Sequence, residues 1–336
     1  MQVLNEIITE SDIAKVLDAI ELQEVRPASD WCSKLLLPDP SAQGRMLPWG
    51  KAHGKFDLRP GEVTIWAGEN GAGKSGAIGQ VIAWQQPRCR AMIASMEMPP
   101  VLTLRRMANQ MFGGPAPREF AAMFADWTGY GEESRLFIYD QLDTVPAKKI
   151  LAVTRLAAER LRLHDIVIDS LTKCGVSGRD KYDQQIAFVD RLAWIAKSTG
   201  VHIHLICHLR KGEDQYGAPN KWDVRGPGEL TDLVDNVVLM WRNRAKEEAE
   251  EAVALDKTVA EDIAKQCDVY LKLGKQRHFP WEGTLGLYFD KRSGQLTPRQ
   301  DRAPMPWPAA GKPVPFEYRA ADAAPDRVTD EGFEEF

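Results

Sequence analysis

A glycine-rich segment at residues 68–75 constrains the fold of this chain more than any other feature. It matches the pattern GxxxxGK[ST], follows an apolar run that predicts a strand, and precedes a run with helical periodicity. Glycines here let backbone N–H groups surround a phosphate chain, and the helix N-terminus adds positive potential. The pattern therefore predicts a nucleoside triphosphate site, although a chance glycine-rich turn would share it. The expected phosphate-binding residues are Gly68, Glu69, Asn70, Gly71, Ala72, Gly73, Lys74 and Ser75.

Strand and helix patterns alternate along the chain from about residue 62 to residue 290. Several of the strand candidates are nearly continuous apolar runs, which are typical of buried parallel strands. The alternation predicts an α/β fold with a mostly parallel central sheet flanked by helices. Strands are expected at Glu62–Ala67, Ala91–Ser95, Leu136–Tyr139, Ile166–Asp169, His202–Cys207, Asn236–Trp241, Val269–Leu273 and Leu285–Phe289. Helices are expected at Lys74–Gln85, Leu102–Met111, Ala147–Arg162 and Gln184–Ser198, with a solvated helix within Ala245–Lys265.

The segments on either side of this core differ from it in composition. Apolar residues at helical spacing predict an amphipathic helix at residues 13–20, and a proline-rich linker follows from about residue 26 to residue 55. We therefore divide the chain into an N-terminal arm at 1–50, a central α/β domain at 51–296 and a tail at 297–336. The apolar face of the N-terminal helix must be buried, either against its own domain or by docking on a neighbouring subunit. The tail is rich in proline and alanine, ends in an acidic peptide with aromatic residues, and is expected to be disordered.

Net charge and cysteine usage narrow the possible environments of the protein. The formal net charge is −5, so a generally basic nucleic-acid binder is excluded and any DNA contact must come from a local groove or ring channel. The cysteines are scattered, which supports neither a disulfide framework nor a zinc site. No apolar run is long enough to span a membrane, and no signal peptide is visible at the start. These features predict a cytoplasmic protein.

Carboxylates at the ends of predicted strands supply the other groups that phosphate chemistry needs. Asp169 ends the run Ile166-Val-Ile-Asp169 and could hold Mg²⁺ together with Ser75, or it could simply cap a helix. Glu97 follows the strand Ala91–Ser95 and could orient a water molecule for hydrolysis, or it could be a surface carboxylate.

Five further segments, in order, resemble the motor of DnaB-type hexameric replicative helicases. Ser95-Met-Glu-Met98 is similar to their "SLEM" element, and the strand that ends at His208 resembles the version found in phage primase–helicases and Twinkle. The later matches are Asp223-Val-Arg-Gly-Pro-Gly228 to "DLRGSG", Asn236–Asn243 to the "RN" strand, and Lys275-Gln-Arg277 to "KQR". The resemblance covers roughly residues 50–296 and implies a RecA-like P-loop NTPase that binds ATP, or another NTP, with Mg²⁺.

The resemblance also implies residue roles. His208 would sense the γ-phosphate, Arg277 would be an arginine finger acting on the neighbouring subunit with Lys275 beside it, and Arg242 and Phe289 would sandwich the base. Alternatively, His208 could be a core histidine, and Arg277 and Lys275 could be surface charges on a sheet edge. Arg242 and Phe289 could simply take part in ordinary packing. The catalytic residues are then Lys74, Glu97, Asp169, His208, Arg277 and Lys275, with Ser75 and Asp169 as Mg²⁺ ligands.

Two basic segments are candidates for contact with DNA in a ring channel. One is the long loop after His208 and the other spans residues 173–181; solvated surface loops are the alternative reading. The expected DNA-binding residues are Lys173, Arg179, Lys181, Arg210, Lys211, Lys221 and Arg225.

Together these features predict an NTP-driven, ring-forming 5′→3′ DNA helicase of phage or bacterial replication, in the host cytoplasm if phage-encoded. Single-stranded DNA, further copies of the chain in a hexamer, and a replication protein bound to the acidic tail are the expected partners. The tail could instead be a plain solubilising segment. Alternative functions are a recombination mediator or helicase-loading ATPase that does not unwind DNA, and a nucleotide-switched scaffold. Neither a primase module nor a DnaB-type N-terminal helical domain is recognisable before the motor.

Overall fold

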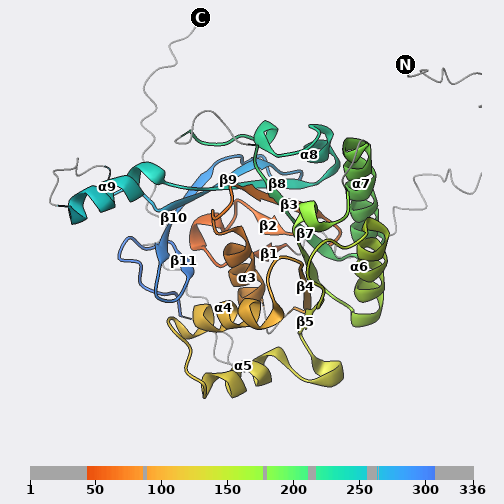
Figure 1. Ribbon diagram of the computed structural model, residues 1–336, viewed down its shortest axis with the longest axis horizontal. Coiled ribbons are helices and arrows are strands. Elements are labelled where there is room, and N and C mark those ends of the chain that lie inside the picture. Colours follow the sequence, from red (N-terminus) through yellow and green to blue (C-terminus); the bar gives the residue numbers. More distant parts are fainter. Residues whose placement is uncertain are drawn as a thin grey trace, which may run out of the picture. The chain divides into compact units, whose positions relative to one another are not determined.

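The computed structural model of the protein describes residues 44–85, 89–176, 180–210, 217–255, 263 and 265–306. These residues form a nine-stranded sheet with the order β11-β10-β9-β8-β3-β7-β6-β4-β5 (Figure 1). Its strands are β3 (Val63–Gly68), β4 (Ala91–Ser95), β5 (Leu136–Ile138), β6 (Asp165–Asp169), β7 (His202–His208), β8 (Asn236–Arg242), β9 (Val269–Lys275), β10 (Thr284–Asp290) and β11 (Gln295–Thr297). Each strand expected from the sequence is present within a few residues.

The sheet is parallel from β8 through β3 to β5 and antiparallel beyond β8. β3 lies between β7 and β8 and pairs with both in parallel register, so its C-terminal end meets theirs at one edge. β9, β10 and β11 then follow as antiparallel neighbours. The predicted mostly parallel α/β fold is confirmed, and the carboxyl ends of its parallel strands share the edge where ligands gather in such sheets.

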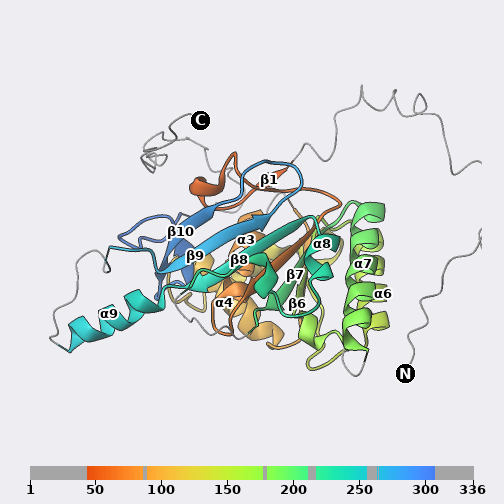
Figure 2. The ribbon, with the colours of Figure 1, turned by 90° about the horizontal axis from the view of Figure 1, so that it is seen from above.

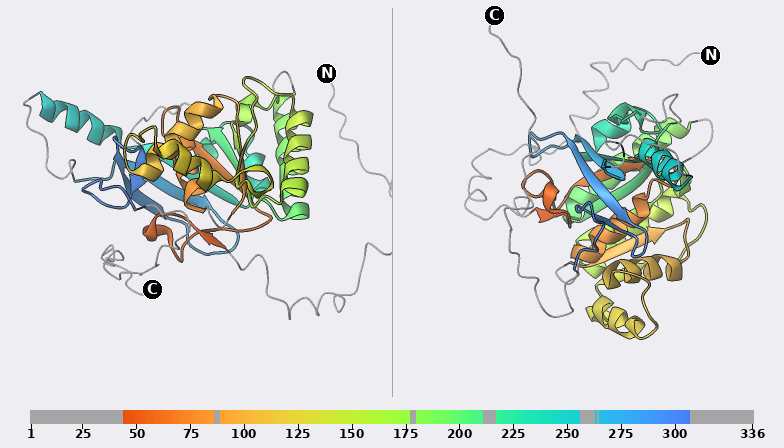
Figure 3. Two further views of the ribbon diagram at one scale, coloured as in Figure 1. Left: turned by 90° about the horizontal axis from the view of Figure 1, so that it is seen from below. Right: turned by 90° about the vertical axis from the view of Figure 1, so that its left-hand side faces the viewer.

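Helices cover both faces of the sheet, as Figures 1 and 2 show. Alternation along each strand divides the core: Ile65 of β3 packs with α6, α7 and α8, whereas Trp66 packs with α3, α4 and α5. A further helix, α9, extends from the end of β8 (Figure 3). The helices are α3 (Lys74–Gln85), α4 (Pro100–Phe112), α5 (Phe120–Thr128), α6 (Ala147–Leu161), α7 (Lys181–Thr199), α8 (Glu229–Leu233) and α9 (Arg244–Ala254).

The N-terminal limit expected for the motor domain is wrong by several residues. β1 (Arg45–Met46) pairs with β2 (Asp57–Leu58), and the segment between them packs on the core. Trp49 is fully buried and its indole N–H donates to the carbonyl of Leu296 at 2.9 Å. The prolines of this region suggested a linker, but its large apolar side chains find a place against the sheet. The helix predicted at 13–20 lies outside the described residues.

The C-terminal limit at residue 296 is also too early. Residues 298–306 follow β11 along the domain: the Met305 amide donates to the Gln295 side chain at 2.7 Å, and Thr297 Oγ1 donates to the Ala303 carbonyl at 3.1 Å. The prolines suggest disorder because proline disfavours helix interiors and central strands, but it does not prevent a segment from packing against the domain. The rest of the expected tail, residues 307–336, lies outside the described part of the chain.

A buried polar network joins the starts of the central strands. Thr64 donates to Nε2 of His202 at 2.9 Å, so the ring proton is on Nδ1 and is donated to the Arg59 carbonyl. Next to it, Trp66 donates to Nδ1 of His204 at 3.1 Å, which leaves Nε2–H of His204 to donate to Asp165. Both histidine rings are therefore satisfied in the core, and neither reaches the site described below.

Burial lowers the pKa of His202 well below its usual 6.5. The unfolded chain binds a proton near pH 6.5 that the folded ring does not, so this contribution to stability is complete above that pH and decreases as pH falls through it. We expect urea unfolding to show a loss of up to about 1.4 kcal/mol per pH unit below pH 6.5 for this proton. His202→Gln should flatten the slope, and an unchanged slope in that variant would assign it to other groups.

No helix in the described part of the chain is long and apolar enough to cross a membrane.

Candidate nucleotide site

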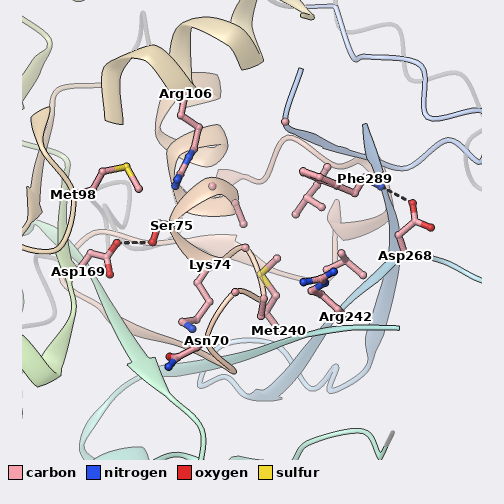
Figure 4. Close-up of a pocket in the computed structure, with 18 of the residues that line it drawn as sticks. Asn70, Lys74, Ser75, Met98, Arg106, Asp169, Met240, Arg242, Asp268 and Phe289 are labelled. Atoms are coloured by element: carbon pink, nitrogen blue, oxygen red, sulfur yellow. Dashed lines mark hydrogen bonds between the residues drawn. The ribbon is translucent and has the colours of Figure 1, made fainter. Parts of the chain in front are cut away.

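A cavity of about 1660 Å³ opens at the edge where the parallel strands end. It runs from the glycine-rich loop after β3, past the ends of β4, β6 and β7, to the antiparallel strands β9 and β10 (Figure 4). Among the residues expected from the sequence, those that line it are Asn70, Gly71, Ala72, Gly73, Lys74, Ser75, Glu97, Asp169, Lys173, His208, Arg242 and Phe289.

The loop at 68–75 has the backbone conformation that its glycines predict. Gly71 and Gly73 have φ of +78° and +92°, values that other residues rarely adopt. A Cβ on Gly68 would lie 2.5 Å from the carbonyl oxygen of Met240 on β8, so only glycine fits there. The sequence of the loop therefore reflects both its turn and its close approach to the neighbouring strand.

Lys74 begins α3 and is buried within the loop. Its ammonium donates to the carbonyls of Gly68 and Glu69, each at 2.8 Å. Burial lowers its pKa, while the nearby carboxylate of Asp169 acts in the opposite direction. A phosphate chain surrounded by the loop amides would lie next to the Lys74 ammonium.

Ser75 and Asp169 come together from different elements, as Figure 4 shows. The Ser75 hydroxyl donates to Oδ2 of Asp169 at 2.6 Å, and Asp169 ends β6 in the pairing register of Ser95 on β4. Burial raises the pKa of Asp169, and the nearby Glu97 also raises it. A hydroxyl and a carboxylate in contact are a donor set that suits Mg²⁺, which is usually bound by a few protein oxygens with substrate phosphates. These residues fit the expected ion.

Glu97 lies close to this pair and is held by a hydroxyl. Ser170 donates to Oε1 of Glu97 at 2.7 Å. Because that proton is used, the 2.6 Å contact between Ser170 and Thr172 must have Thr172 as donor. The carboxylate thus faces the cavity with a fixed orientation, as a group that positions water would require.

His208 is the histidine of β7 that reaches the cavity. Its buried Nδ1 has no hydrogen-bond partner among the described residues. Burial lowers the pKa of the ring and the nearby Lys74 cation lowers it further. The carbonyl of His208 accepts from the amide of Arg225 at 2.8 Å, and Leu209 forms a bridge with Val224. His208 is therefore tied by backbone pairing to the stem of the predicted DNA loop.

Arg242 and Phe289 lie at the other end of the cavity, on β8 and β10. Figure 4 shows both side chains directed into it. Phe289 is 39% exposed, and Arg242 is held by an ion pair with Glu247 at 2.6 Å. The structure thus brings the two expected base-contacting residues to the same cavity as the phosphate loop.

Arg277 and Lys275 lie far from this cavity, at the opposite edge of the sheet. Lys275 pairs with Val237 near the start of β8, whereas Met240 near its end pairs with Gly68. Arg277 forms an ion pair with Asp235 at 3.1 Å, and Lys275 donates to the carbonyls of Thr231 and Asp232. Within one subunit, neither side chain can act on its own phosphate loop.

The expected DNA-binding residues separate into different places. Lys173 lines the nucleotide cavity and forms an ion pair with Asp143 at 3.2 Å. Arg210 donates to the Gly226 carbonyl, which stabilises the stem beside His208. Lys181, Lys221 and Arg225 lie on loop or helix-start positions with partly or largely exposed side chains, and Arg179 and Lys211 lie outside the described residues.

Several cavity residues carried no recognisable signal in the sequence. Arg106 on α4, Lys246 and Glu250 on α9, Asp268 before β9 and Arg302 after β11 all line the cavity. They come from segments with no motif, and only the folding of α9 and the C-terminal segment beside the sheet places them here.

Comparisons with known proteins agree with this geometry. A sequence model of the AAA domain family matches residues 53–214. A DNA helicase/primase of Enterobacteria phage T3 is 27% identical over 207 residues, covering 55% of this chain and 36% of the relative, so the match spans about a third of that protein.

Solved structures resemble the whole domain. A DnaB-like replicative helicase, described with its interactions with primase, has a TM-score of 0.61 at 15% identity and covers 85% of this chain and 70% of its own. The ATPase domain of G40P has a TM-score of 0.60 at 15% identity, covering 82% and 98%. These solved structures show that the described part of the chain has a RecA-like fold, and its sequence and fold are similar to those of DnaB-type helicase motors.

Proposed function

We propose that the protein is a ring-forming, ATP-driven helicase that unwinds duplex DNA during phage or bacterial replication, moving 5′→3′ as the resemblance implies. Lys74 and the loop amides would bind the phosphates, Ser75 and Asp169 would hold Mg²⁺, and Glu97 would orient the attacking water. Bound Mg²⁺ would neutralise charge on the β- and γ-phosphates. The likeness to a DnaB-like replicative helicase and to a phage helicase/primase supports the proposal.

The observation that carries this proposal is the connection between His208 and the loop that follows it. The imidazole of His208 lines the nucleotide cavity. The backbone of residues 208–210 pairs with residues 223–225, where the loop returns to the sheet. A shift of His208 on loss of the γ-phosphate would therefore move the stem of the loop. Lys221 and Arg225 lie in that part of the loop and would move with it. This gives a route from hydrolysis to movement of DNA in the ring channel.

Arg277 lies at the edge of the sheet opposite its own phosphate loop, so as an arginine finger it would act on the site of an adjacent subunit. This role requires assembly into a ring. A hexamer would also repeat Lys181, Lys221 and Arg225 around one axis, giving a positive channel in an acidic particle. The N-terminal arm would strengthen the contact between subunits, and the acidic end of the tail would recruit a replication protein.

The experiment that tests the proposal is ATP hydrolysis with Mg²⁺, with and without single-stranded DNA, followed by strand displacement on a forked duplex. Strong stimulation by DNA together with displacement is the expected result. Stimulation without displacement would indicate a recombination mediator or loading factor. Slow hydrolysis that DNA does not change would instead indicate a nucleotide-switched scaffold.

Lys221 provides a separate test of the DNA-binding loop. Its ammonium lies over the exposed Trp222 ring, 5.1 Å from the centroid. We expect Lys221→Gln to weaken binding of single-stranded DNA and to lower the salt dependence of that binding by about one unit of slope per lost phosphate contact. Arg160→Gln, at the end of α6 near the opposite edge of the sheet, is the matched control. Equal effects of both variants would mean that only net charge matters.

A further inference from the structure

A cluster of charged side chains closes the base end of the cavity. Asp268 is at its centre, and its Oδ1 forms an ion pair with the ammonium of Lys246 at 2.8 Å. Arg302 donates to both carboxylate oxygens of Asp268, from Nε to Oδ2 at 2.8 Å and from Nη2 to Oδ1 at 2.9 Å. Arg302 Nη2 also donates to Glu250 at 2.6 Å. We refer to Asp268 and Arg302 as the base-end clamp.

The clamp holds the backbone of the residue expected to contact the base. Oδ2 of Asp268 accepts from the amide of Phe289 at 2.8 Å, as Figure 4 shows. Burial opposes ionisation of Asp268, but hydrogen bonds from Arg302 and Lys246 overcome it and hold its pKa to about 2. The carboxylate is therefore an anion at neutral pH, and its hydrogen bond to Phe289 is charge-assisted.

Arg302 itself is fixed by its own segment. Its backbone has φ of +56°, an uncommon value for a residue with a side chain. The hydrogen bonds of Ala303 with Thr297 and of Met305 with Gln295 hold the chain on either side. The guanidinium thus reaches the cavity from a segment that has the composition of a disordered tail.

We propose that Arg302 is a positioning residue for the nucleotide base, acting through Asp268 on Phe289. The inference rests on the proposed nucleotide site and adds that residues outside the sequence motifs set the affinity for the base half of the ligand. The phosphate half, held by the loop and α3 at the far end of the cavity, does not depend on the clamp.

The test compares a ligand that has a base with one that lacks it. Calorimetric titration of the full-length protein with Mg²⁺ would use a non-hydrolysable ATP analogue and, separately, inorganic tripolyphosphate. Arg302→Gln removes the charged bridge, and we expect it to weaken analogue binding about tenfold, the scale of one charge-assisted hydrogen bond. Binding of tripolyphosphate should stay within twofold. Arg302→Lys keeps the charge and should recover part of the loss.

Arg299→Gln is the matched control, because Arg299 lies on the same segment and pairs with Asp301, but does not line the cavity. Equal weakening of both ligands by Arg302→Gln would show that the residue supports the fold in general and would overturn the proposal, as would unchanged binding of the analogue. Failure of the unaltered protein to bind either ligand would contradict the proposed function itself.

Discussion

Arg277→Ala is expected to lower ATP hydrolysis by about 10³- to 10⁵-fold while leaving nucleotide binding nearly unchanged. The side chain is 46% exposed at the sheet edge opposite its own phosphate loop. From there a guanidinium can stabilise charge developing on the γ-phosphate only in an adjacent subunit. Steady-state hydrolysis and binding of a fluorescent ATP analogue, measured on the same preparation, check the two halves of this prediction.

Mixing two inactive variants tests the action between subunits directly. Lys74→Ala keeps Arg277 but loses the loop cation, and Arg277→Ala does the reverse. In a random equal mixture about a quarter of the interfaces combine an intact loop with an intact Arg277, because each occurs in half of the subunits. Recovered hydrolysis at that level is expected. Full activity of Arg277→Ala alone, or no recovery on mixing, would remove the arginine finger from the mechanism.

Glu97→Gln is expected to reduce hydrolysis by about 10²- to 10⁴-fold, the range for loss of a general base. The amide keeps the shape of the side chain and can still accept from Ser170, so the cavity and its affinity for nucleotide should be preserved. Single-turnover hydrolysis of pre-bound ATP separates this loss of chemistry from any change in binding.

Ser170→Ala is the matched control for Glu97. It removes the 2.7 Å hydrogen bond that orients the carboxylate but leaves the carboxylate itself. A much smaller loss of hydrolysis than in Glu97→Gln is expected. If Ser170→Ala were as inactive as Glu97→Gln, the orientation of Glu97 would matter more than its basicity, and near-normal turnover of Glu97→Gln would assign the water to another residue.

The sequence was most informative where local chemistry alone requires particular residues. The turn after β3 needs glycine at positions with positive φ and at the close approach of Gly68 to β8, so residues 68–75 could be recognised without a structure. Continuous apolar runs likewise predicted β4, β6 and β7. The polar residue that ends such a run, Asp169, was found because parallel strands end at one edge.

The domain limits failed because composition does not report packing. Trp49 and Met305 belong to proline-rich segments that look like linker and tail, yet both pack against the domain. Hydrophobic burial of a few large side chains depends on a surface that distant strands build. Nothing within either segment encodes that surface.

The sequence by itself determined the phosphate loop, the α/β alternation and the order of the motor motifs, because each depends on residues close together in the chain. Only the tertiary structure decided that Lys173 lies with the nucleotide cavity, that Arg277 faces away from its own site, and that Arg302 reaches the base end. Those placements depend on strand order and on the crossing of segments far apart in sequence. Local periodicity carries no information about either.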